Sequence, residues 1–177
     1  MRALIIYESI FGNTHEIASR IAAGLAPHLE VQVVSTHDAT EDLVGRADVV
    51  IVGGPTHAHG LSSTSSRKGA RENADKPGSQ LDLDPDAAGP GLRDWLRERA
   101  AVRGSSAVAF DTRLDAAAVL TGRASRAIDR RLRSHGYAIV AEPESFLVDK
   151  KNRLLDGEAD RASAWGAHLA RTLTAAP

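Results

Sequence analysis

The stretch that decides the fold reads Ala3-Leu4-Ile5-Ile6-Tyr7-Glu8-Ser9-Ile10-Phe11-Gly12-Asn13-Thr14. Its first five residues form a continuous apolar run, which is typical of a strand buried on both faces of a sheet. Apolar residues then recur at three- and four-residue spacing and predict the buried stripe of a helix: Ile17, Ala18, Ile21, Ala22 and Leu25. Asn13 followed by Glu16 predicts a capping box at the start of this helix. Residues 9–14 are therefore expected to turn the chain from a strand into a helix.

The chemistry of this turn favours an anion. The first turn of a helix has backbone N–H groups without intrahelical partners, and the helix dipole places partial positive charge there. Ser9, Asn13 and Thr14 add short side-chain donors, and Gly12 permits a close backbone approach or a positive φ. The turn has no Lys-Ser or Lys-Thr pair after a glycine, and no Gly-x-Gly-x-x-Gly follows a strand anywhere in the chain. A phosphate cradle of another kind is predicted.

Residues 5–18 resemble the FMN phosphate-binding segment of the flavodoxin family. That segment has an apolar pair, an aromatic residue, a spacer, Ser or Thr, two further positions, a small residue, a spacer, Thr, and Ala four positions later. Every position of the pattern is met between Ile5 and Ala18. The resemblance implies that the FMN phosphate is bound by Ser9, Ile10, Phe11, Gly12, Asn13 and Thr14.

Strand-like and helix-like segments alternate along the rest of the chain. Further strands are predicted at 30–35, 48–53, 105–110 and 137–141, with the last interrupted at Pro143 and resumed at 145–148. Helical patterns are predicted at 90–101, 121–134 and 157–173, and a short helix or turn at 36–45. Such alternation predicts a parallel sheet covered on both faces. With a mononucleotide loop after the first strand, we expect a doubly wound α/β fold. We expect this fold to be a flavodoxin-like three-layer sandwich with a five-stranded parallel sheet of order 2-1-3-4-5.

Two further loops fall where such a sheet binds ligands, beyond the carboxyl ends of its strands. Gly-x-Pro-Thr after the third strand is similar to the flavin-ring loop of the flavodoxins. The resemblance implies ring contacts from Pro55, Thr56, His57, Ala58, His59 and Gly60. The loop after the fourth strand predicts a third wall formed by Phe110, Asp111, Thr112 and Arg113, although Asp111 and Arg113 could instead pair with each other. No metal site is predicted, because the two histidines lack a third ligand within reach in the sequence.

The sequence also departs from the dedicated electron shuttles of that family. Those shuttles carry a tyrosine, and often a tryptophan, that stack on the flavin. Here Trp95 and Trp165 lie on apolar helical stripes and are interpreted as core residues. Shuttles are typically strongly acidic, whereas this chain has a formal net charge of −1. Both departures argue against the very low reduction potential of a shuttle, but not against flavin binding.

The segment 61–89 contains no convincing strand and is interpreted as an irregular insertion within a single flavodoxin-like domain spanning 1–177. A segment of this length inside a compact domain is usually a functional lid or disordered. It follows the predicted flavin loop directly, so a lid that shapes the substrate site is one hypothesis. Residues 65–75 could form a short polar helix.

Composition limits the possible functions. The charge balance argues against nucleic-acid binding, and the absence of cysteine excludes disulfides and thiolate chemistry. No signal peptide or run of membrane-spanning length is found, which leads us to expect a cytoplasmic protein without a membrane partner. The preference for arginine over lysine, with abundant alanine, suggests a bacterial source. The arginines at 123–133 are interpreted as a solvated helix face, with docking of an acidic redox partner or a nicotinamide phosphate as the alternative.

The leading hypothesis is a redox protein that transfers electrons through non-covalently bound FMN to a redox partner protein or a small-molecule acceptor. One alternative is an FMN-dependent NAD(P)H:quinone-type reductase, so it stays open whether the protein is an enzyme. A second alternative is a flavin-free domain that uses the same loop for another phosphate ligand or for regulation. No catalytic residue is predicted, because no Ser-His-Asp arrangement and no paired carboxylates can be identified.

Overall fold

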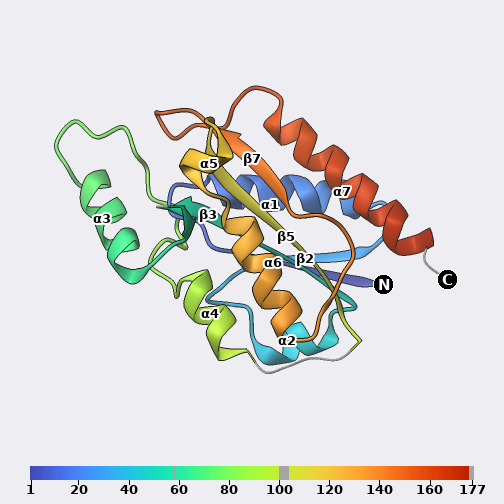
Figure 1. The fold of residues 1–177 in the computed structure, drawn as a ribbon. Helices are drawn as coiled ribbons and strands as arrows, with labels where there is room; N and C mark the ends of the chain where they lie inside the picture. Colours follow the sequence, from blue (N-terminus) through green and yellow to red (C-terminus); the bar gives the residue numbers. More distant parts are fainter. Residues whose placement is uncertain (58, 100–103, 176–177) are drawn as a thin grey trace.

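The central sheet is parallel along the strand path β2-β1-β3-β5-β6, as drawn in Figure 1. The computed structural model describes residues 1–57, 59–99 and 104–175. The strands are β1 (Arg2–Tyr7), β2 (Glu30–Ser35), β3 (Val49–His57), β4 (Gly60–Leu61), β5 (Ser106–Leu114), β6 (Ala138–Ile139) and β7 (Glu144–Val148). Since β6 and β7 both pair in parallel with β5, they are two parts of the predicted fifth strand. The predicted order 2-1-3-4-5 is confirmed, with the short antiparallel strand β4 added beside β3.

The fifth strand is divided because Pro143 lies between its two parts. Proline has no N–H to donate to the sheet, so it interrupts the pairing with β5. The second part, β7, continues beside the carboxyl half of β5, from Phe110 paired with Glu144 to Leu114 paired with Val148. This continuation brings residues 149–152 to the same edge of the sheet as the loops after β1 and β3.

Helices cover the sheet on both faces. The helices are α1 (Asn13–Leu25), α2 (Glu41–Arg46), α3 (Thr64–Ala74), α4 (Leu92–Glu98), α5 (Ala118–Thr121), α6 (Ala124–Ser134) and α7 (Glu158–Ala175). Residues of α1 and α7 join one buried apolar cluster, and residues of α2, α4 and α6 join the other. The helix predicted at 90–101 is observed as α4, and residues 100 and 101 lie outside the described residues.

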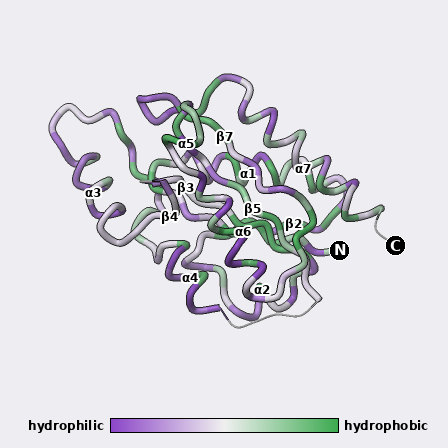
Figure 2. The backbone as a smooth tube through the Cα atoms, in the orientation of Figure 1, coloured by the Kyte–Doolittle hydropathy of each residue, from purple (hydrophilic) through white to green (hydrophobic). Residues whose placement is uncertain are grey.

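The buried aliphatic side chains of the strands form the two cores. Alternate residues of β1 face opposite sides, so that Ile5 lies in the cluster under α1 and Ile6 in the cluster under α6. Figure 2 shows the apolar strands in the middle of the molecule and a hydrophilic α3 at its margin. Trp95 is buried and Trp165 packs against the core beside Phe146, which confirms that both tryptophans are core residues.

The predicted capping box at the start of α1 is wrong. The N-cap residue is Gly12, with φ 85°, and no side chain caps the helix. Asn13 is already helical and its side chain donates to Asn152 O at 2.9 Å, while Glu16 pairs with Arg20 on the exposed helix face. Gly12 adopts a left-handed conformation that other residues reach only with strain, so the backbone of the loop sets the helix start.

The segment 61–89 contains more structure than an irregular insertion. Helix α3 occupies Thr64–Ala74, and Ser63 and Ser66 form a reciprocal capping box at its start. No helix among residues 1–57, 59–99 and 104–175 combines the length and the apolar character needed to cross a membrane.

Candidate cofactor site

A hollow of about 240 Å³ lies at the carboxyl edge of the sheet, where four loops meet. Residues from each predicted loop line it: Ser9, Ile10, Phe11, Asn13 and Thr14; Pro55, Thr56 and His57; Thr112 and Arg113. These segments are separated by up to about 100 positions in the sequence and meet because β1, β3 and β5 are parallel neighbours.

The loop after β1 presents its backbone N–H groups at the start of α1. The first backbone hydrogen bond that closes the helix runs from Glu16 N to Gly12 O at 2.9 Å. Within the described parts of the chain, the N–H groups of Phe11, Asn13 and Thr14 have no acceptor. Free donors at a helix start are the feature that binds anions without a charged side chain.

The hydroxyl groups of the same loop take part in hydrogen bonds and keep donor capacity. Ser9 Oγ accepts from Gly12 N at 3.1 Å, so its own proton is available to another acceptor. Thr14 Oγ1 and Thr112 Oγ1 lie 2.7 Å apart in a buried pair. Since only one of the two protons lies between them, the other can be donated elsewhere.

The loop after β3 contributes its first part to the hollow. His57 lines the hollow, whereas His59 lies beside α5 in a bridge with Gly122, and Gly60 pairs with His57 in the β3–β4 turn. Ala58 lies outside the described residues. Burial lowers the pKa of His57 below its ordinary 6.5, although the nearby Glu8 carboxylate acts in the opposite direction. His57 is therefore neutral at neutral pH.

The third predicted wall is split between the hollow and the core. Thr112 and Arg113 line the hollow, while Phe110 and Asp111 are fully buried beneath it. Asp111 does not pair with Arg113. Its carboxylate accepts from Thr56 Oγ1 at 3.0 Å and from Ser125 N at 2.8 Å, at the start of α6.

Arg113 instead holds the chain that leads into α5. Its Nη1 donates to Ala116 O at 2.7 Å and to Leu114 O at 3.2 Å. Its buried Nε has no hydrogen-bond partner within the described residues. Arg113 thus places positive charge at the hollow while fixing the neighbouring helix.

Sequence reasoning missed a fourth wall, which follows β7 and consists of Val148, Asp149, Lys150 and Asn152, together with Leu114 at the end of β5. A signal was available, because the run at 145–148 is a strand whose carboxyl end must lie at the same edge as the others. Asn152 has φ 60° and receives the side chain of Asn13, so this loop is fastened to the start of α1.

Glu8 was also missed, because in the sequence pattern it is only a spacer. Its side chain is buried and accepts from Ser62 Oγ, at the beginning of the insertion, and at 2.7 Å from Leu92 N, at the start of α4. Its backbone N–H donates to Gly53 O at 3.0 Å. One carboxylate therefore joins the loop after β1 to the beginning of segment 61–89 and to the start of α4, just after that segment.

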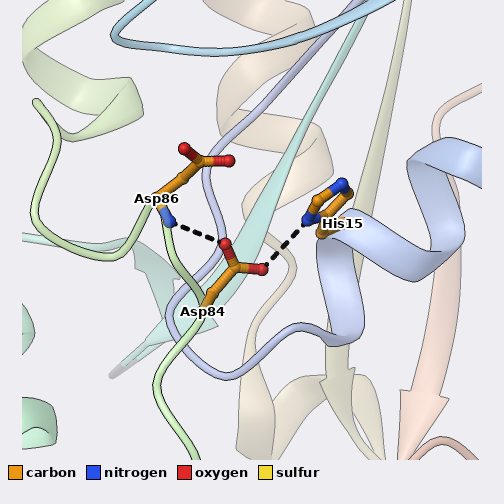
Figure 3. A group of neighbouring side chains, drawn as sticks. All are labelled: His15, Asp84 and Asp86. Carbon is orange, nitrogen blue, oxygen red and sulfur yellow. Dashed lines mark hydrogen bonds and ion pairs between the residues drawn. The ribbon is translucent and has the colours of Figure 1, made fainter.

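Residues near the end of the insertion contact the loop after β1 and the first turn of α1, and Figure 3 shows the contact between Asp84 and His15. Asp84 N donates to Ile10 O at 2.8 Å, and the Asp84 carboxylate lies 3.2 Å from His15 Nδ1. Tyr7 donates to Asp86 at 2.6 Å and stacks on His15, and burial together with this hydrogen bond raises the pKa of Tyr7. His15, Asp84 and Asp86 could each offer a ligand atom to a cation, but these atoms already have partners within the protein.

This site geometry agrees with the comparisons with known proteins. The family model described as "Flavodoxin domain" matches residues 4–72, which include the loops after β1 and β3. The chain is flavodoxin-like in sequence and in fold. No curated protein sequence matches this flavodoxin-like chain at a significant level.

Solved structures resemble the flavodoxin-like fold over almost the whole chain. Flavodoxin 1 from Bacillus cereus is 20% identical with a TM-score of 0.66, and 100% of each chain is covered. Flavodoxin 2 from the same organism is 20% identical with a TM-score of 0.67, covering 97% of this chain and 99% of that one. A flavodiiron core from Synechocystis is 17% identical with a TM-score of 0.64, covering 98% of this chain and 36% of that one. At these identities the likeness concerns the fold.

Proposed function

We propose that this protein binds FMN non-covalently and transfers electrons through it, as a single domain spanning 1–177. The observation that carries the proposal is the hollow in which the three predicted loops meet around unpaired helix N–H groups. When bound, FMN supplies the redox chemistry, and the protein supplies binding, orientation and electrostatics. The cytoplasmic location expected from the sequence remains part of the prediction.

The loop after β1 is assigned to the phosphate. Its free N–H groups at Phe11, Asn13 and Thr14 and the available hydroxyl protons near Ser9 and Thr14 suit a dianion. Gly12 supports this role because its positive φ turns the backbone into the helix. No cationic side chain is required, since backbone donors and the helix dipole already stabilise negative charge.

The flavin ring is assigned to the loops after β3 and β5. Pro55, Thr56, His57, Thr112 and Arg113 line this part of the hollow, and Phe11 supplies an aromatic face in place of the missing stacking pair. Ala58, His59 and Gly60 continue the ring loop in the proposal, and Phe110 and Asp111 support it from beneath. A volume of about 240 Å³ is below the usual ~300–1,000 Å³ of small-molecule sites, so part of the flavin is expected to remain exposed for electron exchange.

The phosphate assignment is tested by the double substitution Ser9→Ala, Thr14→Ala. A hydrogen bond to a charged group contributes about 1.5–3 kcal/mol, or roughly tenfold to a hundredfold in affinity. We expect the variant to lose at least tenfold in FMN affinity and much less in riboflavin affinity, because riboflavin lacks the phosphate. Titration by flavin fluorescence measures both, and Thr172→Ala on the exposed face of α7 is the matched control. Equal losses for FMN and riboflavin would show that the loop is misassigned.

The remaining alternatives are separated by two observations on the purified protein. A visible flavin spectrum and release of FMN on denaturation support the proposal, whereas a colourless protein that takes up no FMN favours the flavin-free alternative. Steady turnover of NAD(P)H with a quinone would identify the reductase. A flavin that is reduced by a partner reductase but not by NAD(P)H alone would identify an electron carrier.

A further inference from the structure

Two exposed aliphatic side chains lie beside three arginines at the edge of the proposed cofactor site. Val119 is 86% exposed and Leu120 is 69% exposed, the highest values among the large apolar side chains of the described residues. With Arg123, Arg126 and Arg130 they form a surface that we call the α5–α6 patch. A shallow hollow of about 440 Å³ lies in this patch and is lined by all of these residues except Leu120, together with His59.

The exposure of Val119 and Leu120 follows from how α5 is held. This four-residue helix contains no buried residue. Arg113 Nη1 holds the chain just before the helix by donating to Ala116 O, and Gly122 N closes the end of the helix by donating to Ala118 O at 2.8 Å. Gly122, with φ 74°, packs so closely on His59 that a Cβ there would lie 2.2 Å from His59 O. Because these backbone contacts hold α5 in place, Val119 and Leu120 remain exposed to solvent.

The arginines of the patch carry charge that the protein does not neutralise. Arg126 and Arg130 are exposed and make no hydrogen bond or ion pair with any residue that the structure describes. Arg123 donates to Ser145 Oγ at 3.0 Å and to Pro143 O at 2.9 Å, both uncharged acceptors. Asp129, the one carboxylate within α6, pairs instead with Arg133. The patch is therefore positive although the chain as a whole has a net charge of −1.

The patch lies where an electron would leave the proposed cofactor site. In Figure 1, α5 lies at the carboxyl ends of β5 and β7. The cofactor hollow lies at the same edge, since Leu114 and Val148, the last residues of these strands, line it. Arg113 lines that hollow and also holds α5, and His59 links the ring loop to Gly122. A molecule bound to the patch would thus approach the exposed part of the flavin.

We propose that the α5–α6 patch docks an acidic partner protein that exchanges electrons with the flavin, an inference that rests on the proposed function. Guanidinium groups pair well with carboxylates, and an apolar centre beside charged residues is the usual composition of a protein interface. A small phosphate ligand would pair with the arginines but leave Val119 and Leu120 exposed to water. A protein surface covers both, which is why the partner is assigned as a protein.

Docking is tested with probe proteins of opposite charge, which requires no flavin. Cytochrome b5 serves as the acidic haem protein and cytochrome c as the basic one, and binding to the immobilised protein is followed by biolayer interferometry at rising salt. We expect cytochrome b5 to bind more tightly than cytochrome c and to be released by salt. Arg126→Glu combined with Arg130→Glu should weaken cytochrome b5 binding roughly tenfold or more, because attraction becomes repulsion.

Two variants separate the patch from general charge effects. Arg171→Glu on α7, at the opposite face, changes the net charge as much as Arg126→Glu and should alter cytochrome b5 binding less than twofold. Leu120→Ser should weaken binding without changing its salt dependence. The proposal is overturned if the double variant binds like the wild type, or if Arg171→Glu matches Arg126→Glu. Circular dichroism checks that each variant is folded.

A second readout relates docking to electron transfer. The FMN-loaded protein is reduced with dithionite and mixed with oxidised cytochrome b5 in a stopped-flow instrument. The proposal is supported if the rate of electron transfer to cytochrome b5 falls with salt and falls in the double variant. It is overturned if the rate depends on neither the salt concentration nor the substitutions. If the wild type binds cytochrome b5 but takes up no FMN, the proposed function fails while the docking surface stands.

Discussion

His57 is the residue whose protonation state the fold controls most clearly within the candidate site. Burial lowers its pKa, so the folded protein binds a proton there less readily than the unfolded chain does. Well above pH 6.5 the residue is neutral in both states and does not contribute to the pH dependence of stability. Below that pH the unfolded chain takes up the proton first, and the free energy of unfolding falls.

We therefore expect the wild type to lose stability as the pH falls through about 6.5 and on to about 5.5. The variant His57→Gln, which cannot take up a proton, should lose less over the same interval. Urea unfolding at a series of pH values measures the difference. His28→Gln, at an exposed position, is the control and should follow the wild type. Parallel curves for His57→Gln and the wild type would contradict the assignment.

At the scale of elements, α1 and α7 pack together through glycines. A Cβ at Gly24 would lie 2.0 Å from Ser163 O, and one at Gly166 would lie 2.3 Å from Ile21 O. Both obstacles are backbone atoms, which cannot be moved aside by a side-chain rotation. The absence of a side chain at these two positions thus allows the helices to approach.

Gly24→Ala should accordingly lower the free energy of unfolding by about 1–3 kcal/mol or more, the usual cost of overpacking. Gly45→Ala is the matched control, because nothing lies within 4 Å of a Cβ there and alanine favours a helix. Denaturant unfolding compares the two. If Gly24→Ala leaves the free energy of unfolding unchanged, α1 and α7 can move apart to accept the methyl group without loss of stability.

The insertion 61–89 is fastened to the loop after β1 by Asp84, whose side chain is 1% exposed. Asp84→Ala removes the acceptor of Asp86 N and the partner of His15. Leaving buried polar groups unpaired costs about 1–3 kcal/mol, so the insertion should open more often. Limited proteolysis within 62–89 should accelerate, and FMN affinity should fall because, whenever the insertion opens, the backbone N–H of residue 84 no longer donates to Ile10 O.

Asp82→Ala provides the control for this change. Asp82 is exposed in the same segment and has no hydrogen bond or ion pair among the described residues. It should leave both proteolysis and FMN binding close to those of the wild type. If Asp84→Ala shows the same rate of proteolysis and the same FMN affinity as Asp82→Ala, the insertion does not stabilise the loop after β1.

At the scale of the whole molecule, the proposed cofactor joins loops from four strands. A ligand that binds the folded state alone adds about 2.7 kcal/mol at a concentration one hundred times its Kd. For a chain of this size that raises Tm by roughly 5–10 °C. Scanning calorimetry with FMN should show this rise, and the double substitution Ser9→Ala, Thr14→Ala should reduce it. An unchanged Tm at saturating FMN would contradict the proposed function.

Local pattern was sufficient to predict the strands and helices of the sheet, whereas the strand order rested on the resemblance of the loop after the first strand to the flavodoxins. Buried parallel strands read as apolar runs, and the helices between them show a stripe of apolar side chains, so both are visible within short segments. The core roles of Trp95 and Trp165 followed from the same stripes. The capping prediction at Asn13 failed because Gly12 has a positive φ that starts the helix without a side chain, and Asn13 bonds to Asn152, 139 positions away.

The sequence by itself determined the alternation of strands and helices, the position of the turn at residues 9–14 and the edge of the sheet where a ligand would bind. Only the tertiary structure decided that Glu8 and Asp84 fasten the insertion, that residues after β7 form a fourth wall, and that Phe110 and Asp111 lie beneath the hollow. The physical reason is that apolar periodicity is a property of neighbouring residues. The partner of a buried carboxylate or amide, in contrast, is set by which distant loops the folded sheet brings together.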